Sequence, residues 1–541
     1  MRRGSTEIAL LAAVVAVVAL FALVPAADLF ARSLASSGGS SAVGAVLADP
    51  LDRAALRNSL VQGGLSAALA IALGYPAGVF VGRYRWFGRG TVRSALLLPF
   101  LLPSLVMVLG VLDLFGPSGL LGGPVPSFRW FASGLPGIVV VNLFYNVPIV
   151  VVLTATGCEA SSSALEESVA SLGGGPGRAY LEAWAWPSWV GAACGGLLTF
   201  VFSALSFAPP ILLCGNRCAT SEVAVYQLAY VAGEPAVAGT LAFVLVLLFL
   251  APALVYVLLM RRLRAARGRT NRPRPPPWGA PSTWALAATF TAVVVAEGAL
   301  VLSVLVRSVL PPGGGPLGRG WTLLFAPSTS ARLGISLEGA VGNTLFFAAL
   351  AAGVAIVLAT ASSFVTARRP ALATALGLVL FVPVLLSPVV LAQALATFWQ
   401  PLVGGGADVW VLIVLSQALL ALPFAVQSLE IPLAGLPRAG AEAAQGLGAS
   451  SWGAYVDAEL PRVRRGVQTA LLFAFALGLG EFTATYFLVT PQSRFRTLPV
   501  AVYALTGGRL YPAAGAAAAL LLALSLVVFA AIVAGGADGR S

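Results

Sequence analysis

The side chains that most often carry chemistry are few in this chain, and two residue types are missing altogether. The sequence contains no histidine and no lysine, so all 32 basic residues are arginine. Without lysine there is no phosphate-binding loop of the GxxxxGK(S/T) type and no Schiff-base chemistry. Without histidine there is no Ser-His-Asp triad, no Cys-His pair and no histidine metal site. We therefore predict no catalytic residue and no metal site.

Polar side chains within the apolar segments are the candidates for a solute path. Glu481 is the lone acid in the segment LGLGEFTATYF, and Ser206 takes its place in the first half of an internal repeat. Asn142 and Asn146 are weaker candidates. A buried carboxylate in a membrane needs a partner or a cavity, so we expect these residues to line a translocation path. The alternatives are helix packing for Glu481 and interhelical hydrogen bonds for the asparagines.

The composition predicts that membrane-spanning helices position these residues. Of the 541 residues, 59% are hydrophobic and 10% are charged, whereas a soluble domain carries roughly 25% charged residues. Apolar runs of about 20 residues can each cross a bilayer once, and backbone in lipid must satisfy its own hydrogen bonds as helix. We expect an all-α polytopic protein of the plasma or inner membrane. The twelve predicted spans are 8–30, 59–82, 94–114, 135–157, 191–213, 237–260, 281–310, 340–365, 371–397, 409–430, 467–490 and 514–535.

Arginine placement predicts the orientation of these spans. Most arginines fall in inner segments if the N-terminus is inside, which puts both termini in the cytoplasm. The basic, proline-rich segment from Arg261 to Pro277 cannot continue a helix and predicts a cytoplasmic linker at 261–280. It divides the chain into parallel six-span domains at 1–260 and 281–541. The net charge of +12 fits contact with anionic lipid rather than with nucleic acid.

The best-matched part of the repeat is a polar loop between spans four and five and again between ten and eleven. At an offset of 275 residues, Glu167 falls on Glu442, and Gly173 falls on Gly448. The second copy reads AEAAQGLGASSWGAYVDAELP and predicts a helix that ends at Gly446 or Gly448. Ser450 or Ser451 would then cap a second short helix that stops before Pro461. We expect an elbow that a partner could approach, with an amphipathic surface connector as the alternative.

The residues Glu442, Ala443, Ala444, Gly448 and Pro461 resemble the EAA signature of ABC-importer permeases. That loop forms the helix through which such permeases contact their ATP-binding subunits. We place the second loop at about 431–466. The first loop, at about 158–190, resembles the signature less closely. It keeps Glu167 and Gly173 but has Ser168 and Val169 in place of the two alanines, and Gly174 to Gly177 predict a looser turn. Whether this loop still couples is left open.

Two such domains in one chain resemble the permeases of iron(III) and thiamine uptake systems. The resemblance implies a permease subunit that forms the solute path and makes or breaks no covalent bond. It implies ABC ATP-binding subunits in the cytoplasm, two copies being expected, and a solute-binding protein on the other side of the membrane. ATP and Mg would be bound by the partner subunit, with no cofactor in this chain. The solute class, iron(III) or thiamine, stays open.

Two rival hypotheses for the function and one question of cysteine pairing remain open. An ion-gradient-driven secondary transporter with two six-helix halves shares the topology, although it gives the elbows no purpose. A membrane-embedded enzyme would need clustered acids or nucleophiles at one depth, and the sequence offers none. Cys214 and Cys218 lie four residues apart, and either a disulfide or two free thiols fits that spacing.

Overall fold

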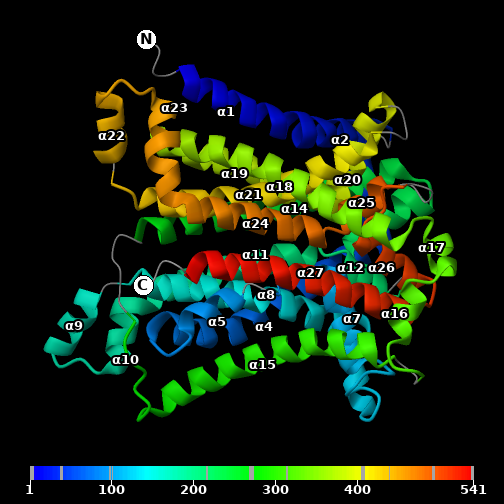
Figure 1. Cartoon of the computed structure of the whole chain (residues 1–541), viewed down its shortest axis with the longest axis horizontal. Helices are drawn as coiled ribbons and strands as arrows, with labels where there is room; N and C mark the ends of the chain where they lie inside the picture. Colours follow the sequence, from blue (N-terminus) through cyan, green and yellow to red (C-terminus); the bar gives the residue numbers. More distant parts are fainter. Residues whose placement is uncertain are drawn as a thin grey trace.

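In the computed structural model the chain is a bundle of long helices that lie roughly side by side (Figure 1). The structure describes residues 5–36, 40–96, 99, 102–161, 163–214, 217–266, 273–311, 315–403, 408–437, 439–489 and 494–537. Every regular element within these ranges is helical, apart from one isolated bridge between Tyr84 and Arg274. The prediction of an all-α polytopic membrane protein is confirmed.

Nine helices in the described ranges are long and apolar enough to cross a membrane. They are α1–η1–α2 (Ser5–Val18, Ala19–Leu23 and Val24–Ser36), α4 (Pro50–Arg83), α8 (Gly134–Glu159), α11 (Ala185–Ala204), α14 (Pro235–Ala266), α15 (Pro281–Val309), α18 (Leu337–Arg368), α21 (Val409–Ala434) and α27 (Tyr511–Ala537). They account for nine of the twelve predicted spans. The predicted third, ninth and eleventh spans take other forms.

Shorter elements complete the bundle. The short α-helices are α3 (Ser40–Ala48), α5 (Arg89–Ala95), α7 (Ser104–Phe115), α9 (Ser163–Ser171), α10 (Pro176–Ala179), α12 (Ala208–Leu213), α13 (Ser221–Tyr226), α16 (Arg319–Leu324), α17 (Pro327–Leu333), α19 (Ala373–Leu385), α20 (Ser387–Val403), α22 (Ala439–Gly446), α23 (Ser451–Ala454), α24 (Arg464–Gly480), α25 (Thr483–Leu488) and α26 (Leu498–Gly507). The π and 3-10 turns are η2 (Pro126–Ala132), η3 (Tyr180–Trp184), η4 (Gln227–Val231), η5 (Pro370–Leu372), η6 (Tyr455–Glu459) and η7 (Leu460–Val463).

The predicted ninth span is broken in the middle. Helices α19 and α20 meet at an angle of 86°, and Ser387 at the break has a φ of +58°. Ser387 precedes Pro388, and a proline disfavours the helical conformation in the residue before it. The Ser387 hydroxyl donates to the buried carboxylate of Glu222 at 2.8 Å, so the first half of the chain holds this break in place.

The predicted third and eleventh spans are shorter than expected. Residues 97, 98, 100 and 101 of the third span lie outside the described residues, and α7 begins directly after Pro103. In the eleventh, α24 has 17 residues and ends at Gly480 before the short helix α25. Broken helices in membranes are tolerated where the freed backbone is buried in protein or lines a cavity. The breaks therefore point to the interior between the halves.

The two halves have equivalent packing. Helices α4, α8 and α11 contact one another in the first half, and α18, α21 and α24 do so in the second. The first helix of each half also contacts the other half: α1 packs against α18, and α15 packs against α4 and α7 as well as against α27 of its own half. One continuous hydrophobic core contains buried residues of both halves, such as Met107 and Leu391. The domain boundaries remain a prediction.

Small residues let α4 and α8 approach closely. A Cβ atom on Gly78 would lie 2.5 Å from the Cβ of Thr154, and one on Gly82 would lie 2.8 Å from Ala155. Gly74 meets Val150 in the same way at 2.7 Å. Glycines spaced by four on one helix face are a common interface in membranes, where van der Waals contact drives helix association.

The predicted linker needs one correction. Helix α14 continues to Ala266, so the arginines that follow Met260 extend the helix instead of ending it. Residues 267–272 lie outside the described part of the chain. Arg274 then lies beside the end of α4, where its backbone bonds to Arg83 and Arg85 at 3.0 and 2.8 Å.

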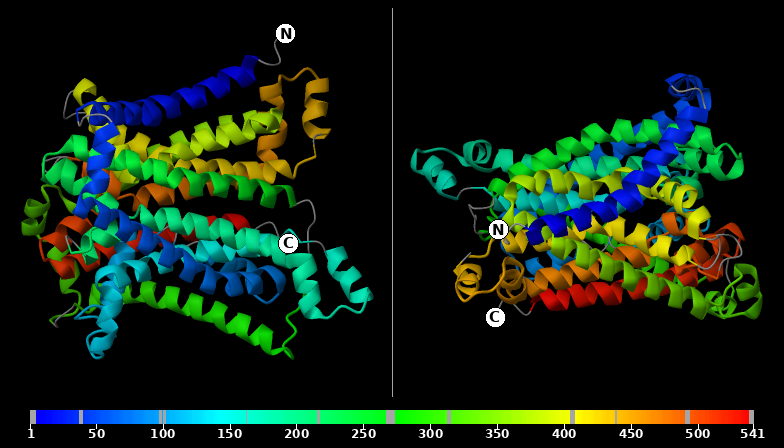
Figure 2. Two further views of the ribbon diagram at one scale, coloured as in Figure 1. Left: turned by 180° about the vertical axis from the view of Figure 1, so that it is seen from behind. Right: turned by 90° about the horizontal axis from the view of Figure 1, so that it is seen from above.

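The bundle has two distinct ends. One end carries α9–α10, α22–α23, the start of α1 and the end of α27, and the opposite end carries α16, α17 and α26 (Figures 1 and 2). We call them the elbow end and the far end. The start of α1 and the end of α27 thus lie on the same side of the bundle as the two elbows.

Candidate functional site

Two elbows of the same form project from the elbow end, one from each half. The first consists of α9, a turn, α10 and η3, and the second of α22, a turn, α23 and η6 (Figure 1). Each turn contains a glycine with positive φ, +76° at Gly173 and +95° at Gly448. Glycine takes this conformation readily, whereas a side chain meets steric resistance. These two glycines define the elbow turns.

Equivalent hydrogen bonds close the two turns. The N–H of Gly174 donates to the Val169 carbonyl at 2.9 Å, and the N–H of Ala449 donates to the Ala444 carbonyl at 3.0 Å. Each bond spans five residues, as in the Schellman motif that ends many helices. The first turn is thus closed in the same way as the second, although more glycines follow it in the sequence.

The chain beyond the second turn differs in part from the sequence prediction. Ser450 caps α23 by accepting a hydrogen bond from the Gly453 N–H at 2.9 Å, as one of the two predicted caps. The second helix does not stop before Pro461, because η6 and η7 carry the chain into α24. Pro461 lies in the first turn of η7, where its missing N–H is not required. The π turns η3 and η6 occupy equivalent positions in the repeat.

The predicted signature residues lie on the surface of the elbows. Glu167 is exposed, with its carboxylate 3.7 Å from the Arg274 guanidinium. Glu442 and Ala443 are exposed and Ala444 is half-buried. These side chains are available to a partner, and their role in coupling remains a prediction.

A leucine stands at the tip of each elbow, and sequence reasoning gave it no role. Leu172 is 84% exposed and Leu447 is 91% exposed, and the two are equivalent in the repeat. Each directly precedes the glycine of its turn. Both tips therefore present a leucine to the surroundings of the bundle at equivalent positions of the repeat.

In each half, an arginine at the end of a long helix binds a side chain of the elbow. Arg368, at the end of α18, forms a two-pronged ion pair with Glu459, with distances of 2.8 and 3.1 Å. Arg83, at the equivalent end of α4, bonds to Glu166 at 2.6 Å. The Arg83 guanidinium also lies 4.0 Å above the ring of Trp184, which is the repeat equivalent of Glu459. The two halves use different chemistry for the same mechanical link.

Tyrosine provides a second tie in each half. The Tyr455 hydroxyl bonds to the Ser363 hydroxyl on α18 at 2.9 Å, and Tyr180 bonds to Tyr75 on α4 at 2.8 Å. Burial raises the pKa of Tyr455 to about 12, so it remains a neutral hydrogen-bonding group. With the arginines, these contacts make each elbow rigid with respect to its bundle.

We predict that Arg368→Gln destabilises the second half. Both partners of the Arg368–Glu459 pair are largely buried, with 17% and 11% of their side chains exposed. Removing one partner of a buried pair leaves an unpaired charge and costs roughly 3–5 kcal/mol. The melting temperature of the purified protein measures this. The Arg368→Leu/Glu459→Leu double variant should recover most of the loss, and equal loss in both variants would contradict the assignment.

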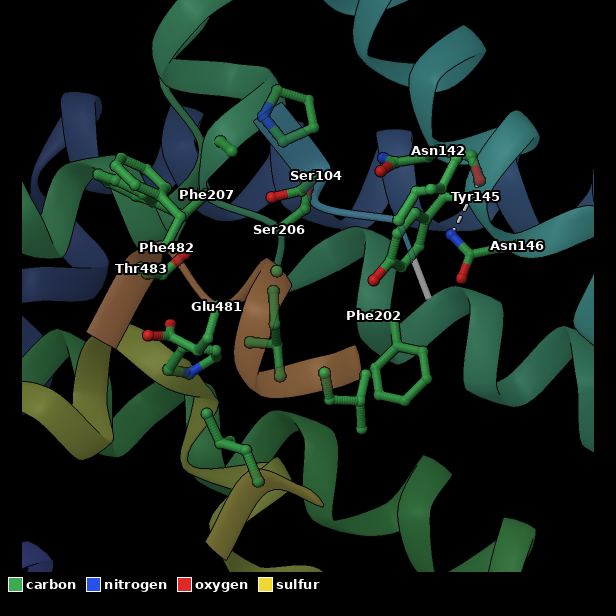
Figure 3. A pocket seen from close by; sticks show the side chains of 18 of the residues that line it. Ser104, Asn142, Tyr145, Asn146, Phe202, Ser206, Phe207, Glu481, Phe482 and Thr483 are labelled. Atoms are coloured by element: carbon green, nitrogen blue, oxygen red, sulfur yellow. Dashed lines mark hydrogen bonds between the residues drawn. The ribbon is translucent and has the colours of Figure 1, made fainter. Parts of the chain in front are cut away.

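A cavity of about 230 Å³ lies between the two halves. The four residues predicted for the solute path, Glu481, Ser206, Asn142 and Asn146, all line it. Figure 3 shows Glu481 and Phe482 on one side and Asn142, Tyr145 and Asn146 on the other. The breaks at the ends of α11 and α24 supply Ser206 and Glu481. Their role in transport remains a prediction.

The two asparagines also join helices of the first half. The Asn142 side chain donates to the side-chain amide oxygen (Oε1) of Gln62 on α4 at 2.7 Å. Asn146 donates to the Ser203 hydroxyl on α11 at 3.3 Å and to the backbone carbonyl of Asn142 at 2.8 Å. The two asparagines therefore form the interhelical hydrogen bonds of the alternative interpretation, and they also line the cavity. Gln62 was not a candidate from sequence.

The Glu481 carboxylate is fixed at the start of α25. It accepts from the Ala484 N–H at 2.6 Å and from the Thr485 N–H at 2.9 Å. The Thr485 hydroxyl donates to it at 2.6 Å. A carboxylate offers about four acceptor positions, and these donors, together with the Thr483 backbone, occupy them. These bonds hold a negative charge at a defined place in the cavity wall.

Aromatic rings from both halves form a layer between the cavity and the far end. The rings of Phe207 and Phe482, which are repeat equivalents, stack with centroids 6.2 Å apart. Behind them lie Tyr226 and Tyr503, also repeat equivalents, at 5.6 Å from Phe207 and 5.1 Å from Phe482. Tyr486 joins the two sides, with its hydroxyl 3.4 Å from that of Tyr226. We call these five residues the aromatic layer.

The repeat held a signal for the residues that sequence reasoning left without a role. Phe207 and Phe482, Tyr226 and Tyr503, and Tyr180 and Tyr455 are matched pairs in the sequence. Gln62 and Thr485 carried no such signal, because their roles depend on contacts that the sequence does not show.

The four cysteines are of two kinds. Cys214 and Cys218 form a disulfide with their Cα atoms 5.3 Å apart, which decides between the two alternatives that the spacing left open. Cys158 and Cys194 are buried free thiols.

Comparison with known proteins agrees with this arrangement. No model of a protein family matches the chain. The chain is 27% identical over 523 residues to the thiamine transport system permease protein ThiP of Brucella abortus, an alignment that covers 91% of each chain. It is 28% identical over 503 residues to the ThiP of Escherichia coli K12, covering 88% of each.

A third relative matches about one half of the chain. The molybdenum transport system permease protein ModB of Mycobacterium tuberculosis is 32% identical over 238 residues. These residues are 41% of the present chain and 84% of the ModB chain. The present chain therefore aligns with one permease over less than half of its length and with others over most of its length.

Proposed function

Since the chain belongs to the family of ABC-importer permeases that includes ModB and ThiP, we propose that it carries a small organic cation of the thiamine class. It is a multi-pass membrane subunit of an importer and not an enzyme. The observation that supports the cation is the single carboxylate of Glu481, held among aromatic rings in the central cavity. Thiamine is the solute named for the two full-length relatives.

The cavity wall favours an organic cation over iron(III). Besides Glu481, the wall contains the rings of Tyr145, Phe202, Phe207 and Phe482. Aromatic faces attract organic cations, whereas a hard metal cation prefers several oxygen ligands. One fixed carboxylate, which balances a single positive charge, suits a monovalent organic cation.

The two elbows support a pair of partner subunits. One ATP-binding subunit on each elbow would give two copies, with ATP and Mg held by those subunits and no cofactor in this chain. The exposed Leu172 and Leu447 would enter grooves on them. The elbow end would then be cytoplasmic, together with both termini. A solute-binding protein would dock at the far end.

The proposed mechanism moves the elbows and the aromatic layer together. Closure of the ATP-bound subunits draws the elbows toward each other, and the arginine and tyrosine ties pass this movement to α4 and α18. Such rigid-body shifts are a common form of switching. The movement separates Phe207 from Phe482 and opens the cavity to the far end. Hydrolysis of the ATP in the partner subunits and release of ADP and phosphate would reverse it.

Competition for uptake tests the proposed solute. Cells that lack their own thiamine importer would express the chain with its ATP-binding and solute-binding partners, and labelled thiamine uptake would be measured. We expect excess thiamine to block uptake and excess iron(III) or molybdate to leave it unchanged. Absence of thiamine uptake, with uptake of iron(III) or molybdate instead, would overturn the proposal. Cells that express the chain without its partners are the control.

A further inference from the structure

A second and larger cavity lies at the far end of the first half. Its volume is about 1000 Å³, and its walls come from α3, the start of α4, η4 and the start of α14. We call it the outer cavity. It is distinct from the central cavity, and none of the residues predicted for the solute path lines it.

Three carboxylates face the outer cavity, those of Asp49, Asp52 and Glu234, against one guanidinium, that of Arg217. Asp49 caps α4 through the backbone N–H of Leu51 at 2.7 Å. The cavity is therefore net acidic, at an end of the molecule whose second half is rich in arginine.

Asp52 is the unusual member of this group. The residue is only 7% exposed, and its carboxylate makes no hydrogen bond or ion pair to any described residue. Burying a charge without a partner is costly. Because Asp52 lines the cavity, a cation there would supply the missing partner.

The outer cavity adjoins the aromatic layer. Tyr226 lines the outer cavity, while its ring contacts Phe207 at 5.6 Å and Phe207 lines the central cavity. One layer of rings thus separates the two cavities. A solute that waits in the outer cavity would be next to the contact that must open.

We propose that the outer cavity is a binding site for the organic cation before it passes the aromatic layer, with the Asp52 carboxylate as its counter-ion. The inference rests on the proposed function, which supplies the charge of the solute. Asp49 and Glu234 add to the negative potential around the opening, and Tyr226 offers a ring face to the cation. The walls are mostly apolar, as in many sites for small organic ligands.

Protection of an introduced thiol tests this site. Ala45 is exposed and lines the outer cavity, so Ala45→Cys can react with a membrane-impermeant maleimide. The native free thiols are buried. The assembled complex with its ATP-binding subunits would be used in proteoliposomes without ATP. We expect thiamine to slow the labelling several-fold, and Asp52→Asn to abolish this protection.

Control variants separate this inference from the proposed function. Glu338 is exposed in the first turn of α18, as Asp52 is in the first turn of α4, and Glu338→Gln should leave the protection unchanged. Glu481→Gln should also leave it unchanged, although it impairs transport. If Asp52→Asn does not fold, the exposed pair Asp49→Asn and Glu234→Gln should still weaken the protection.

Three outcomes would overturn the outer site. The first is labelling that thiamine does not slow, and the second is protection that survives Asp52→Asn. The third is protection by a solute-binding protein but not by thiamine, which would assign the cavity to protein docking. Normal thiamine transport by Glu481→Gln would instead count against the central site and leave the outer site standing.

Discussion

Replacing Leu447 by aspartate is expected to detach the ATP-binding subunits and abolish ATP-driven uptake while leaving the chain folded. The side chain is 91% exposed, so the bundle gains little from it. Burial of this leucine at a partner interface would contribute about 2 kcal/mol. A charge in its place should weaken the complex roughly 30-fold or more. Co-purification in detergent and ATP-dependent uptake are the measurements.

Matched leucines show whether the effect belongs to the elbow. Leu172→Asp alters the equivalent tip of the first half and tests whether that elbow also couples. Leu317 is 70% exposed in the segment before α16, at the far end of the bundle, and Leu317→Asp should leave the complex intact. If Leu447→Asp co-purifies as well as the wild type, the tip is not part of the interface.

Glu481→Gln is expected to reduce uptake of the organic cation at least tenfold. The variant keeps the size of the side chain but removes the negative charge from the cavity, and about 1.4 kcal/mol of lost cation binding in the path corresponds to a factor of ten. Uptake rates at several solute concentrations measure the effect. Glu481→Asp keeps the charge and should retain more activity.

The role of Glu481 as a helix cap has to be separated from its role in the path. The single carbonyl oxygen of Gln cannot accept from all the donors that now face the carboxylate, so some destabilisation of α25 is expected, about 1–2 kcal/mol. Thr485→Val removes one of these hydrogen bonds but keeps the charge. Near-normal uptake by Thr485→Val favours the path. An equal loss in both variants would make Glu481 a structural residue.

Local features of the elbows could be predicted from the sequence because their causes are local. Gly448 occupies a backbone conformation that favours glycine, and Ser450 caps the next helix with its own hydroxyl. The repeat then carried the same geometry to Gly173. Pro461 was misjudged because a proline in the first turn of a helix is as acceptable as one after its end.

The breaks in the spans were harder to predict. Hydropathy measures the length of an apolar run but does not register a change of direction within it. Pro388 was visible in the sequence, but the bend also depends on Ser387 and on its hydrogen bond to Glu222 in the other half. That contact joins residues far apart in the chain.

The contacts of α1 and α15 with the opposite half could not be predicted either. In lipid, surfaces that face acyl chains and surfaces that face another helix have similar composition. The hydrophobic pattern of a span therefore does not say which neighbour it chooses. The candidate path residues, by contrast, could be found from the sequence, because polar side chains are rare in the spans.

The most direct measurement is the energy source of uptake in proteoliposomes that contain the complete complex. Thiamine and its binding protein would be outside, and either ATP in the lumen or an ion gradient without ATP would be supplied. We expect uptake with ATP alone, no uptake with the gradient alone, and loss of the ATP-driven uptake in Leu447→Asp. Uptake driven by the gradient without ATP, and unaffected by Leu447→Asp, would contradict the assignment and make the chain a secondary transporter.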